Sequence, residues 1–252
     1  MTAVSPDSPG SVGSPTTGTP STGAPRIVLA IDTATVVCAA LARDGQLLAS
    51  GRVDDTRAHV ERLVPLVTEL CEQAGIALTD VTDVAVGVGP GPFTGLRVGV
   101  VTALTLAALA GTTARGVCTL DIAARQYVLG RGVPPGADGP ADASEFVAAI
   151  DARRKELYWA RYDADGTRLD GPFVGPASEL PDLPVVGPGA GLAAKSEPDL
   201  PLDVAVLAQV PDTFTDAGLE PLYLRKPDAE VSTSRKSALQ PGVRLSLKGN
   251  RR

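Results

Sequence analysis

The chain has 252 residues, with 23 Lys or Arg against 29 Asp or Glu, so its formal net charge is −6 at pH 7. This length allows one larger domain or two small lobes, and the negative balance disfavours binding of a nucleic-acid backbone by the body of the protein. The single histidine, His59, excludes two-histidine metal sites, zinc fingers and HExxH peptidases. Three separated cysteines, Cys38, Cys71 and Cys118, are typical of reduced, buried thiols in a cytosolic protein.

The two ends of the chain differ in composition from its body. Residues 1–25 are mostly Ser, Thr, Pro and Gly, so we expect a disordered leader, and they lack the basic start and apolar core of a secretory signal. Residues 228–252 are expected to be a disordered basic tail. Contact of this tail with RNA and a purely solvated tail both stay open at this point. Without residues 1–25 and 231–252 the body has 17 basic and 28 acidic residues, a charge of −11.

Two passages of the sequence share one plan. The first runs from Arg26 through an apolar segment that stops at Asp32, followed by a strand pattern, the hairpin signal Asp44-Gly45 and a third strand pattern. The second runs from Phe146 to Asp151, and Asp165-Gly166 precedes its third strand pattern. Each passage predicts a three-stranded meander whose first strand ends in an aspartate.

A second repeated segment supports an internal duplication. The apolar run ending in "VGVGPG" (86–91) recurs as "PVVGPG" (184–189), in the same order relative to the meanders. We therefore expect an α/β protein of two similar lobes, with mixed sheets and flanking helices, over residues 26–118 and 119–227. The Gly/Pro-rich stretch 130–144 is expected to be an exposed insertion or linker.

Two helices are predicted in the first lobe. One begins at His59, where apolar residues recur at three- and four-residue steps, and Pro65 should remove one backbone bond from it. The other spans Gly95–Gly111 and is apolar nearly all round, so it is a core helix or a helix closed by a partner. With an arginine and about 16 residues it is short for a membrane span, which needs roughly 20 apolar residues.

The segment "GVGPGPFTGLRVGV" (87–100) resembles a phosphate-binding loop only superficially. It fits neither the G-x-G-x-x-G dinucleotide pattern nor the P-loop, because no Gly-Lys pair occurs in the chain. Pro90 and Pro92 also lack the N–H groups that such a loop would donate. A tight turn that starts a helix and a ligand contact are both consistent with this segment.

Five motifs, in order along residues 26–227, resemble those of the bacterial TsaB family, which belongs to the actin-like ATPase (ASKHA) superfamily. They are "LAIDTAT" (29–35), "RAHVERLVPLV" (57–67), "GVGPGPFTGLRVGV" (87–100), "AAIDARRKELYWARY" (148–162) and "EPLYLRKP" (220–227). The related transferase TsaD carries a histidine pair for its metal after the glycine-loop helix. Residues 114–125 contain no histidine here, so the resemblance implies a subunit without catalytic or metal-binding residues.

The resemblance implies a scaffold for tRNA modification in the cytoplasm. The first-lobe helices would bind TsaD, TsaE would dock on the joint bundle, and TsaC would supply threonylcarbamoyl-adenylate for transfer to adenosine 37 of ANN-decoding tRNAs. ATP and metal would be handled by these partners, with no cofactor on this chain and no membrane contact, and alone the chain would form a homodimer. The interface residues expected on this basis are His59, Leu63, Leu66, Arg97, Val100, Ala103, Leu104 and Ala107.

An alternative function is that of an actin-like ATPase or small-molecule kinase, with a magnesium nucleotide held between the lobes by Asp32 and Asp151. Each aspartate is also consistent with a strand-end residue that caps its own turn, and for Asp151 this interpretation is preferred. The candidate nucleotide or interface contacts are Asp32, Thr33, Gly89, Gly91, Thr94 and Gly95. Three further expectations are a solvated turn at Arg153 and Arg154, an anchor at Tyr223 and Arg225, and an Arg97 that pairs with a partner's carboxylate or reaches solvent.

Overall fold

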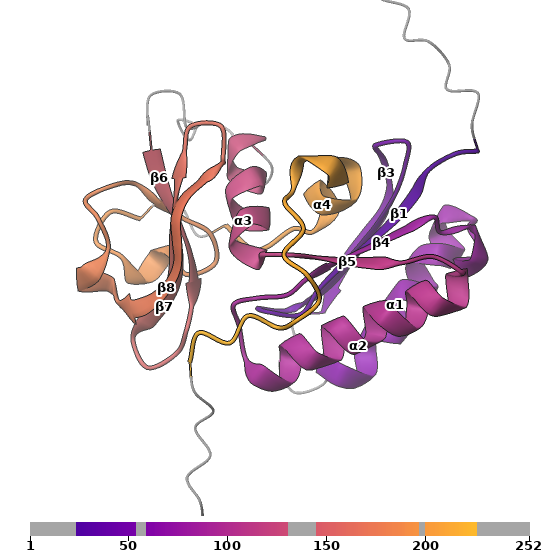
Figure 1. The fold of residues 1–252 in the computed structure, drawn as a ribbon, viewed down its shortest axis with the longest axis horizontal. Helices are drawn as coiled ribbons and strands as arrows, with labels where there is room; N and C mark the ends of the chain where they lie inside the picture. Colours follow the sequence, from indigo (N-terminus) through magenta and orange to yellow (C-terminus); the bar gives the residue numbers. More distant parts are fainter. Residues whose placement is uncertain (1–23, 54–58, 131–144, 197–199, 226–252) are drawn as a thin grey trace, which may run out of the picture.

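The structure, a computed structural model, describes residues 24–53, 59–130, 145–196 and 200–225. Most of the leader expected at residues 1–25, most of the Gly/Pro-rich stretch 130–144 and the basic tail at 228–252 lie outside these ranges, and so do the side chains of His59 and Val60. The described residues form two sheets with helices between them and on one outer face (Figure 1).

The first sheet has the strand order β3-β2-β1-β4-β5. The strands β1 (Ile27–Asp32), β2 (Val37–Arg43) and β3 (Gln46–Val53) form the predicted antiparallel meander, and β4 (Asp83–Gly87) and β5 (Ala114–Val117) continue it in parallel. Asp44 and Gly45 both have positive φ, 50° and 79°, as a two-residue hairpin turn of the primed type requires. The hairpin signal is therefore confirmed.

The second sheet repeats this arrangement with the order β8-β7-β6-β9. Its meander consists of β6 (Glu145–Asp151), β7 (Glu156–Asp163) and β8 (Arg168–Pro176), and the short β9 (Val185–Val186) lies parallel to β6 as β4 lies parallel to β1. The two segments that break into Gly-Pro-Gly thus follow equivalent strands. The expected mixed sheets of two similar α/β lobes are confirmed.

The longer helices take two different positions. The helices α1 (His59–Ala74) and α2 (Phe93–Ala110) lie side by side on the outer face of the first sheet, whereas α3 (Thr119–Val128) and α4 (Ala205–Gln209) lie between the two sheets (Figure 1). α2 starts two residues before the predicted Gly95, and Gly111 caps its end with a φ of 74°. Short 3-10 turns are η1 (Leu78–Asp80), η2 (Ala177–Glu179), η3 (Ala190–Leu192) and η4 (Pro211–Thr213).

The two lobes share a hydrophobic core. One cluster of buried side chains contains residues of β1 and β2 together with residues of α3, α4, β6 and β7. After the second sheet the chain returns to the first: α4 packs on β1–β3, and the Ala217 N–H donates to the Gly116 carbonyl on β5 at 2.8 Å. The last part of the range 119–227, assigned to the second lobe from the sequence, therefore packs on the first sheet.

Helix α2 is long and apolar enough to cross a membrane by length and composition alone. In this fold it packs on β4 and β1 of the first sheet, and Arg97 lies within it. Core helices of soluble proteins pass the same test of length and composition.

Candidate functional site

Asp32, at the end of β1, is fully buried at the centre of the first lobe. Its Oδ1 accepts a hydrogen bond from the Ala34 N–H at 2.7 Å, and its Oδ2 accepts one from the Thr119 hydroxyl, also at 2.7 Å. The Thr119 oxygen in turn accepts the Gly89 N–H at 3.1 Å. The carboxyl group thus joins the β1–β2 turn, the glycine loop and the start of α3.

Burial has a clear electrostatic effect on this carboxyl group. Desolvation raises the pKa of Asp32 from 3.8 to about 6, although the bonds from Thr119 and Ala34 lower it. The neighbouring Gly87 must lack a side chain, since a Cβ atom there would lie 1.6 Å from Asp32 Oδ2. Asp32 is therefore enclosed by its own chain, and its contact with a nucleotide or magnesium stays a prediction.

The glycine loop packs against the turn that follows β1. A Cβ atom on Gly91 would lie 2.9 Å from Ala34 Cβ, and one on Gly95 would lie 2.7 Å from the Thr33 carbonyl oxygen. The Thr33 hydroxyl, itself buried, donates to the Gly95 carbonyl at 2.8 Å. These glycines serve close packing between the turn and α2, because any side chain would separate the two segments.

Among the six candidate nucleotide or interface contacts, five are buried or covered by other parts of the chain. Asp32 and Thr33 are buried, Gly89 bonds to Thr119, and Gly95 is covered by Thr33. Gly91 is also buried, although it lines a pocket of about 230 Å³ between the lobes. Thr94 alone among the six is exposed, at the first turn of α2.

Asp151, at the end of β6, is the counterpart of Asp32 in the second lobe. Its Oδ1 accepts the Arg153 N–H at 2.7 Å, the same two-residue turn bond that Asp32 makes with Ala34. Its Oδ2 lies 3.6 Å from the Arg153 guanidinium. Asp151 therefore bonds within its own turn, and the nucleotide-holding role that the ATPase alternative gives to the two aspartates stays a prediction.

The predicted interface residues on α1 and α2 are mostly part of the chain's own core. Five of them are between 0% and 8% exposed and pack against the first sheet: Leu63, Leu66, Val100, Ala103 and Ala107. These five side chains therefore face the chain's own first sheet and not its surface. The small residues at 99, 103 and 107 face the sheet and the turn at Thr33, so they allow α2 to approach its own lobe closely.

The exposed apolar residues lie on the solvent-facing sides of the same two helices. Leu104 is 44% exposed, as predicted for an interface residue, and it is joined by Val64, Val101 and Leu109 at 50%, 61% and 64%. Beside them an apolar groove of about 530 Å³ runs between α1, α2 and η1, lined by Val67, Cys71 and Leu106 among others. The sequence contained the signal for Val64, Val101 and Leu109 in its all-round apolar pattern, but it did not indicate which side faces the sheet.

Arg97 binds within its own chain. Its Nε donates to the Tyr223 hydroxyl at 2.9 Å, and its guanidinium lies 3.9 Å from the centre of the Phe93 ring. Phe93 and Tyr223 are in contact, with ring centres 4.9 Å apart. Neither alternative predicted for Arg97 anticipated this contact, which anchors the C-terminal segment to the start of α2.

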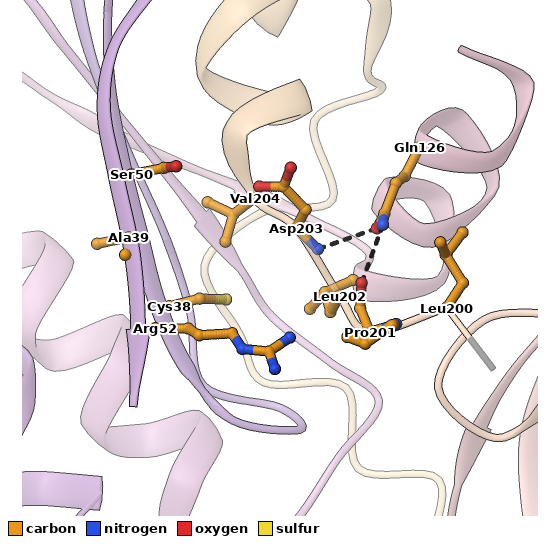
Figure 2. Close-up of a pocket in the computed structure, with 11 residues that line it drawn as sticks. Cys38, Ala39, Ser50, Arg52, Gln126, Leu200, Pro201, Leu202, Asp203 and Val204 are labelled. Carbon is orange, nitrogen blue, oxygen red and sulfur yellow. Dashed lines mark hydrogen bonds between the residues drawn. The ribbon is translucent and has the colours of Figure 1, made fainter. Parts of the chain in front are cut away.

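A second interlobe cavity, of about 410 Å³, lies between β2–β3 and the segment before α4 (Figure 2). Cys38 and Arg52 project from the strands, and Asp203 and Gln126 lie opposite them. The Gln126 amide donates to the Pro201 carbonyl and accepts the Asp203 N–H, each at 2.9 Å. Burial raises the pKa of the Cys38 thiol well above its usual value. Across the described ranges, no group of three His, Cys, Asp or Glu is placed to hold a metal ion.

Comparison with known proteins finds one matching family model and several relatives. The family model of TsaD, described as tRNA N6-adenosine threonylcarbamoyltransferase, matches residues 54–182, which is half of the chain. An uncharacterized protein of Mycobacterium leprae is 38% identical over 227 residues, covering 82% of this chain and 57% of that protein. The tRNA threonylcarbamoyladenosine biosynthesis protein TsaB of Escherichia coli is 40% identical over 139 residues, covering 55% of each chain. The chain thus spans a little more than half the length of these two relatives.

A solved structure shows the same architecture over its whole length. YeaZ from Pseudomonas aeruginosa superimposes with a TM-score of 0.62 and 27% identity, covering 79% of this chain and 100% of that one. The repeated meander, the parallel fourth strand and the helices between the sheets define a two-lobed α/β protein of the actin-like ATPase type. Together with the TsaB relatives, these matches show that the chain belongs to the TsaB/YeaZ family.

Proposed function

We propose that this chain is the TsaB-type subunit of the tRNA threonylcarbamoyladenosine pathway and that it binds and activates a TsaD-type transferase. The observation that carries this proposal is the exposed apolar face of α1 and α2, formed by Val64, Val101, Leu104 and Leu109 beside the 530 Å³ groove. Large apolar patches on a soluble protein are typical of protein interaction sites. We call this surface the α1–α2 face.

The helices are long enough for a stable contact. α1 has 16 residues and α2 has 18, and they lie side by side on one side of the molecule (Figure 1). A standard protein interface buries about 1,600 Å² in total, which two such helices on each partner would supply. The same face would form a homodimer when the transferase is absent, and the joint bundle would offer a docking place for TsaE.

The proposed role is non-catalytic. The whole sequence contains one histidine, and the region after α2 (residues 114–125, which include β5 and the first part of α3) has none, so the chain lacks the histidine pair expected of a metal-dependent transferase. The two aspartates that end β1 and β6 bond to their own turns. We therefore propose that ATP, metal and threonylcarbamoyl-adenylate are handled by partner subunits in the cytoplasm, with the tRNA bound by the complex.

Reconstitution tests this proposal. Purified TsaD, TsaE, TsaC and unmodified tRNA should form threonylcarbamoyladenosine, measured by mass spectrometry of nucleosides, only when this protein is added. The variant Val101→Glu/Leu104→Glu should reduce complex formation with TsaD at least tenfold in size-exclusion chromatography, because it places two charges in an apolar interface. Full modification without this chain would contradict the proposal.

The matched controls separate binding from folding. Glu69→Gln lies on the exposed side of α1 and should leave the complex intact. Ala103→Glu places a charge at a fully buried position, so it should unfold the chain as monitored by circular dichroism. If Ala103→Glu were folded and deficient only in TsaD binding, the interface would lie on the sheet-facing side of α2 and the assignment of the α1–α2 face would be wrong.

A further inference from the structure

A further small pocket lies where the second lobe meets the segment that returns to the first sheet. Its volume is about 170 Å³, below the roughly 300–1,000 Å³ of pockets that hold drug-sized ligands. Helix α3 contributes Asp121 and Arg125 to its walls, β8 contributes Arg168, and the end of η4 with the residues after it contributes 213–215. No lining residue belongs to the α1–α2 face or to the glycine loop. The size of the pocket suits a small ion.

The charges that line this pocket do not balance. Asp121 and Arg125 are four residues apart on α3, a spacing at which opposite charges often pair. The carboxylate has other partners, because its Oδ1 accepts the Tyr162 hydroxyl at 2.7 Å and lies 3.4 Å from the Arg168 Nε. Within the part of the chain that the structure describes, the Arg125 side chain has neither an ion pair nor a hydrogen bond. Two guanidinium groups thus share one carboxylate, a local charge of +1 in a chain of formal charge −6.

These charges are partly shielded from water. The Asp121 and Arg168 side chains are 14% and 27% exposed, and Arg125 is half-buried. The buried Phe214 forms an apolar wall of the same pocket. The effective dielectric constant is lower in such surroundings than at an open surface, so an opposite charge is attracted more strongly. An anion that enters the pocket would supply the partner that Arg125 lacks.

The walls of the pocket come from both lobes. Arg168 and the exposed Thr167 belong to the second meander, whereas the exposed Thr215 belongs to the segment that returns to the first sheet. This segment is fixed to the first sheet next to the pocket, because Asp212 of η4 forms an ion pair with Arg26, directly before β1. An ion in the pocket would therefore contact groups that are attached to different sheets.

We propose that this pocket binds one tetrahedral oxyanion of the size of inorganic phosphate, held between the lobes by the guanidinium groups of Arg125 and Arg168. A guanidinium presents two parallel N–H donors that match the oxygens of a phosphate. The hydroxyl groups of Thr167 and Thr215 can each donate one more hydrogen bond. The ion is either free phosphate or the end group of a phosphate monoester, whose remaining atoms would extend past these exposed threonines.

Thermal unfolding and calorimetry of the full chain test this proposal. Inorganic phosphate, glycerol phosphate and chloride are compared at equal ionic strength for the wild type and Arg125→Gln. The Tm of the wild type should rise by about 3–6 °C at a tenfold excess of phosphate over its Kd. Arg125→Gln should bind phosphate at least tenfold more weakly, yet match the Tm of the wild type in chloride, since the Arg125 side chain has no partner among the described residues. Tighter binding of glycerol phosphate than of phosphate identifies a monoester, and the reverse order identifies the free ion.

The control variant Arg43→Gln removes the same charge from an exposed position outside the pocket and should bind phosphate as the wild type does. A second measurement needs no variant: phosphate should slow the amide hydrogen exchange of residues 166–168 and 213–215, followed by mass spectrometry. The proposal would be overturned if the wild type did not bind phosphate saturably, if chloride had the same effect, or if Arg125→Gln bound phosphate as tightly as the wild type.

This site is independent of the proposed binding of TsaD. Arg125→Gln should still form the complex with TsaD, because Arg125 lies on α3 and not on the α1–α2 face. Val101→Glu/Leu104→Glu should still bind phosphate. The two proposals therefore fail separately.

Discussion

Asp32 and Asp151 occupy equivalent positions in the two lobes, but their surroundings differ. Each ends the first strand of a meander and accepts an N–H from the second residue after it. Asp32 is fully buried and also accepts the Thr119 hydroxyl, whereas the Asp151 side chain is 39% exposed beside Arg153. The sequence predicted the position of both residues, because the strand patterns stop at them. Their difference depends on α3, which is packed over Asp32 through contacts distant in sequence.

Replacement of Asp32 by Asn should change how stability depends on pH. The pKa of Asp32 is about 6 in the folded chain against 3.8 without burial, so between these values the folded state keeps a proton that the unfolded state releases. The contribution of Asp32 to the free energy of unfolding therefore falls as pH rises through this window. Urea unfolding should show the wild type gaining about 1–3 kcal/mol relative to Asp32→Asn between pH 7.5 and pH 4.5.

The matched control for this measurement is Asp151→Asn. It makes the same carboxyl-to-amide change in the equivalent, half-exposed turn, where the amide oxygen can still accept the Arg153 N–H, so it controls for the substitution itself. A constant difference between the wild type and Asp32→Asn across the window would mean that Asp32 stays ionised in the folded protein.

The apolar pattern of helix α2 does not indicate which of its faces is buried. Apolar residues occur on all its sides, so the sequence predicted the helix and its length to within two residues but not its buried face. The close approach of Gly95 and Gly99 to Thr33 fixes the rotation of the helix on the sheet. Once this rotation is set, Val101, Leu104 and Leu109 are the side chains that point outward.

A Gly99→Ala substitution tests this rotation, because the sign of its effect on the free energy of unfolding depends on whether Gly99 is packed or open. In an exposed helix, alanine for glycine stabilises by about 1 kcal/mol. Here the added Cβ would lie 2.3 Å from Thr33 Oγ1, so Gly99→Ala should lower the free energy of unfolding by about 1–3 kcal/mol. In a Thr33→Ala background the loss should shrink, which a double-mutant cycle by urea unfolding would measure. Stabilisation by Gly99→Ala would show that this side of α2 is open.

The molecule as a whole joins two duplicated lobes through shared structure. One hydrophobic cluster includes residues of both sheets and of the two helices between them. The C-terminal segment links the lobes again, since the Leu222 N–H donates to the Val88 carbonyl at 2.8 Å and Arg225 donates to the Ala152 carbonyl at 3.0 Å. Separate unfolding of either lobe would expose the common core to water.

The two lobes should therefore unfold in one transition. Trp159, the single tryptophan, lies in β7 and contacts Phe173, so its fluorescence reports the second lobe. Far-UV circular dichroism is dominated by α1 and α2 of the first lobe, the longest helices in the described part of the chain. The two signals should show the same urea midpoint. Midpoints separated by more than experimental error would demonstrate lobes that unfold independently.

The sequence by itself determined the local elements and their duplication. Strand patterns ending in Asp32 and Asp151, the Asp44-Gly45 turn and the apolar helix depend on neighbours along the chain, and the motifs around them were sufficient to indicate the family. Only the tertiary structure decided that Leu63 and Ala103 face inward, that Asp32 is fully buried, and that Arg97 contacts Tyr223. Those outcomes depend on which segments distant in sequence cover a side chain. Such cover removes the side chain from water, and for Asp32 it also raises the pKa of the carboxyl group.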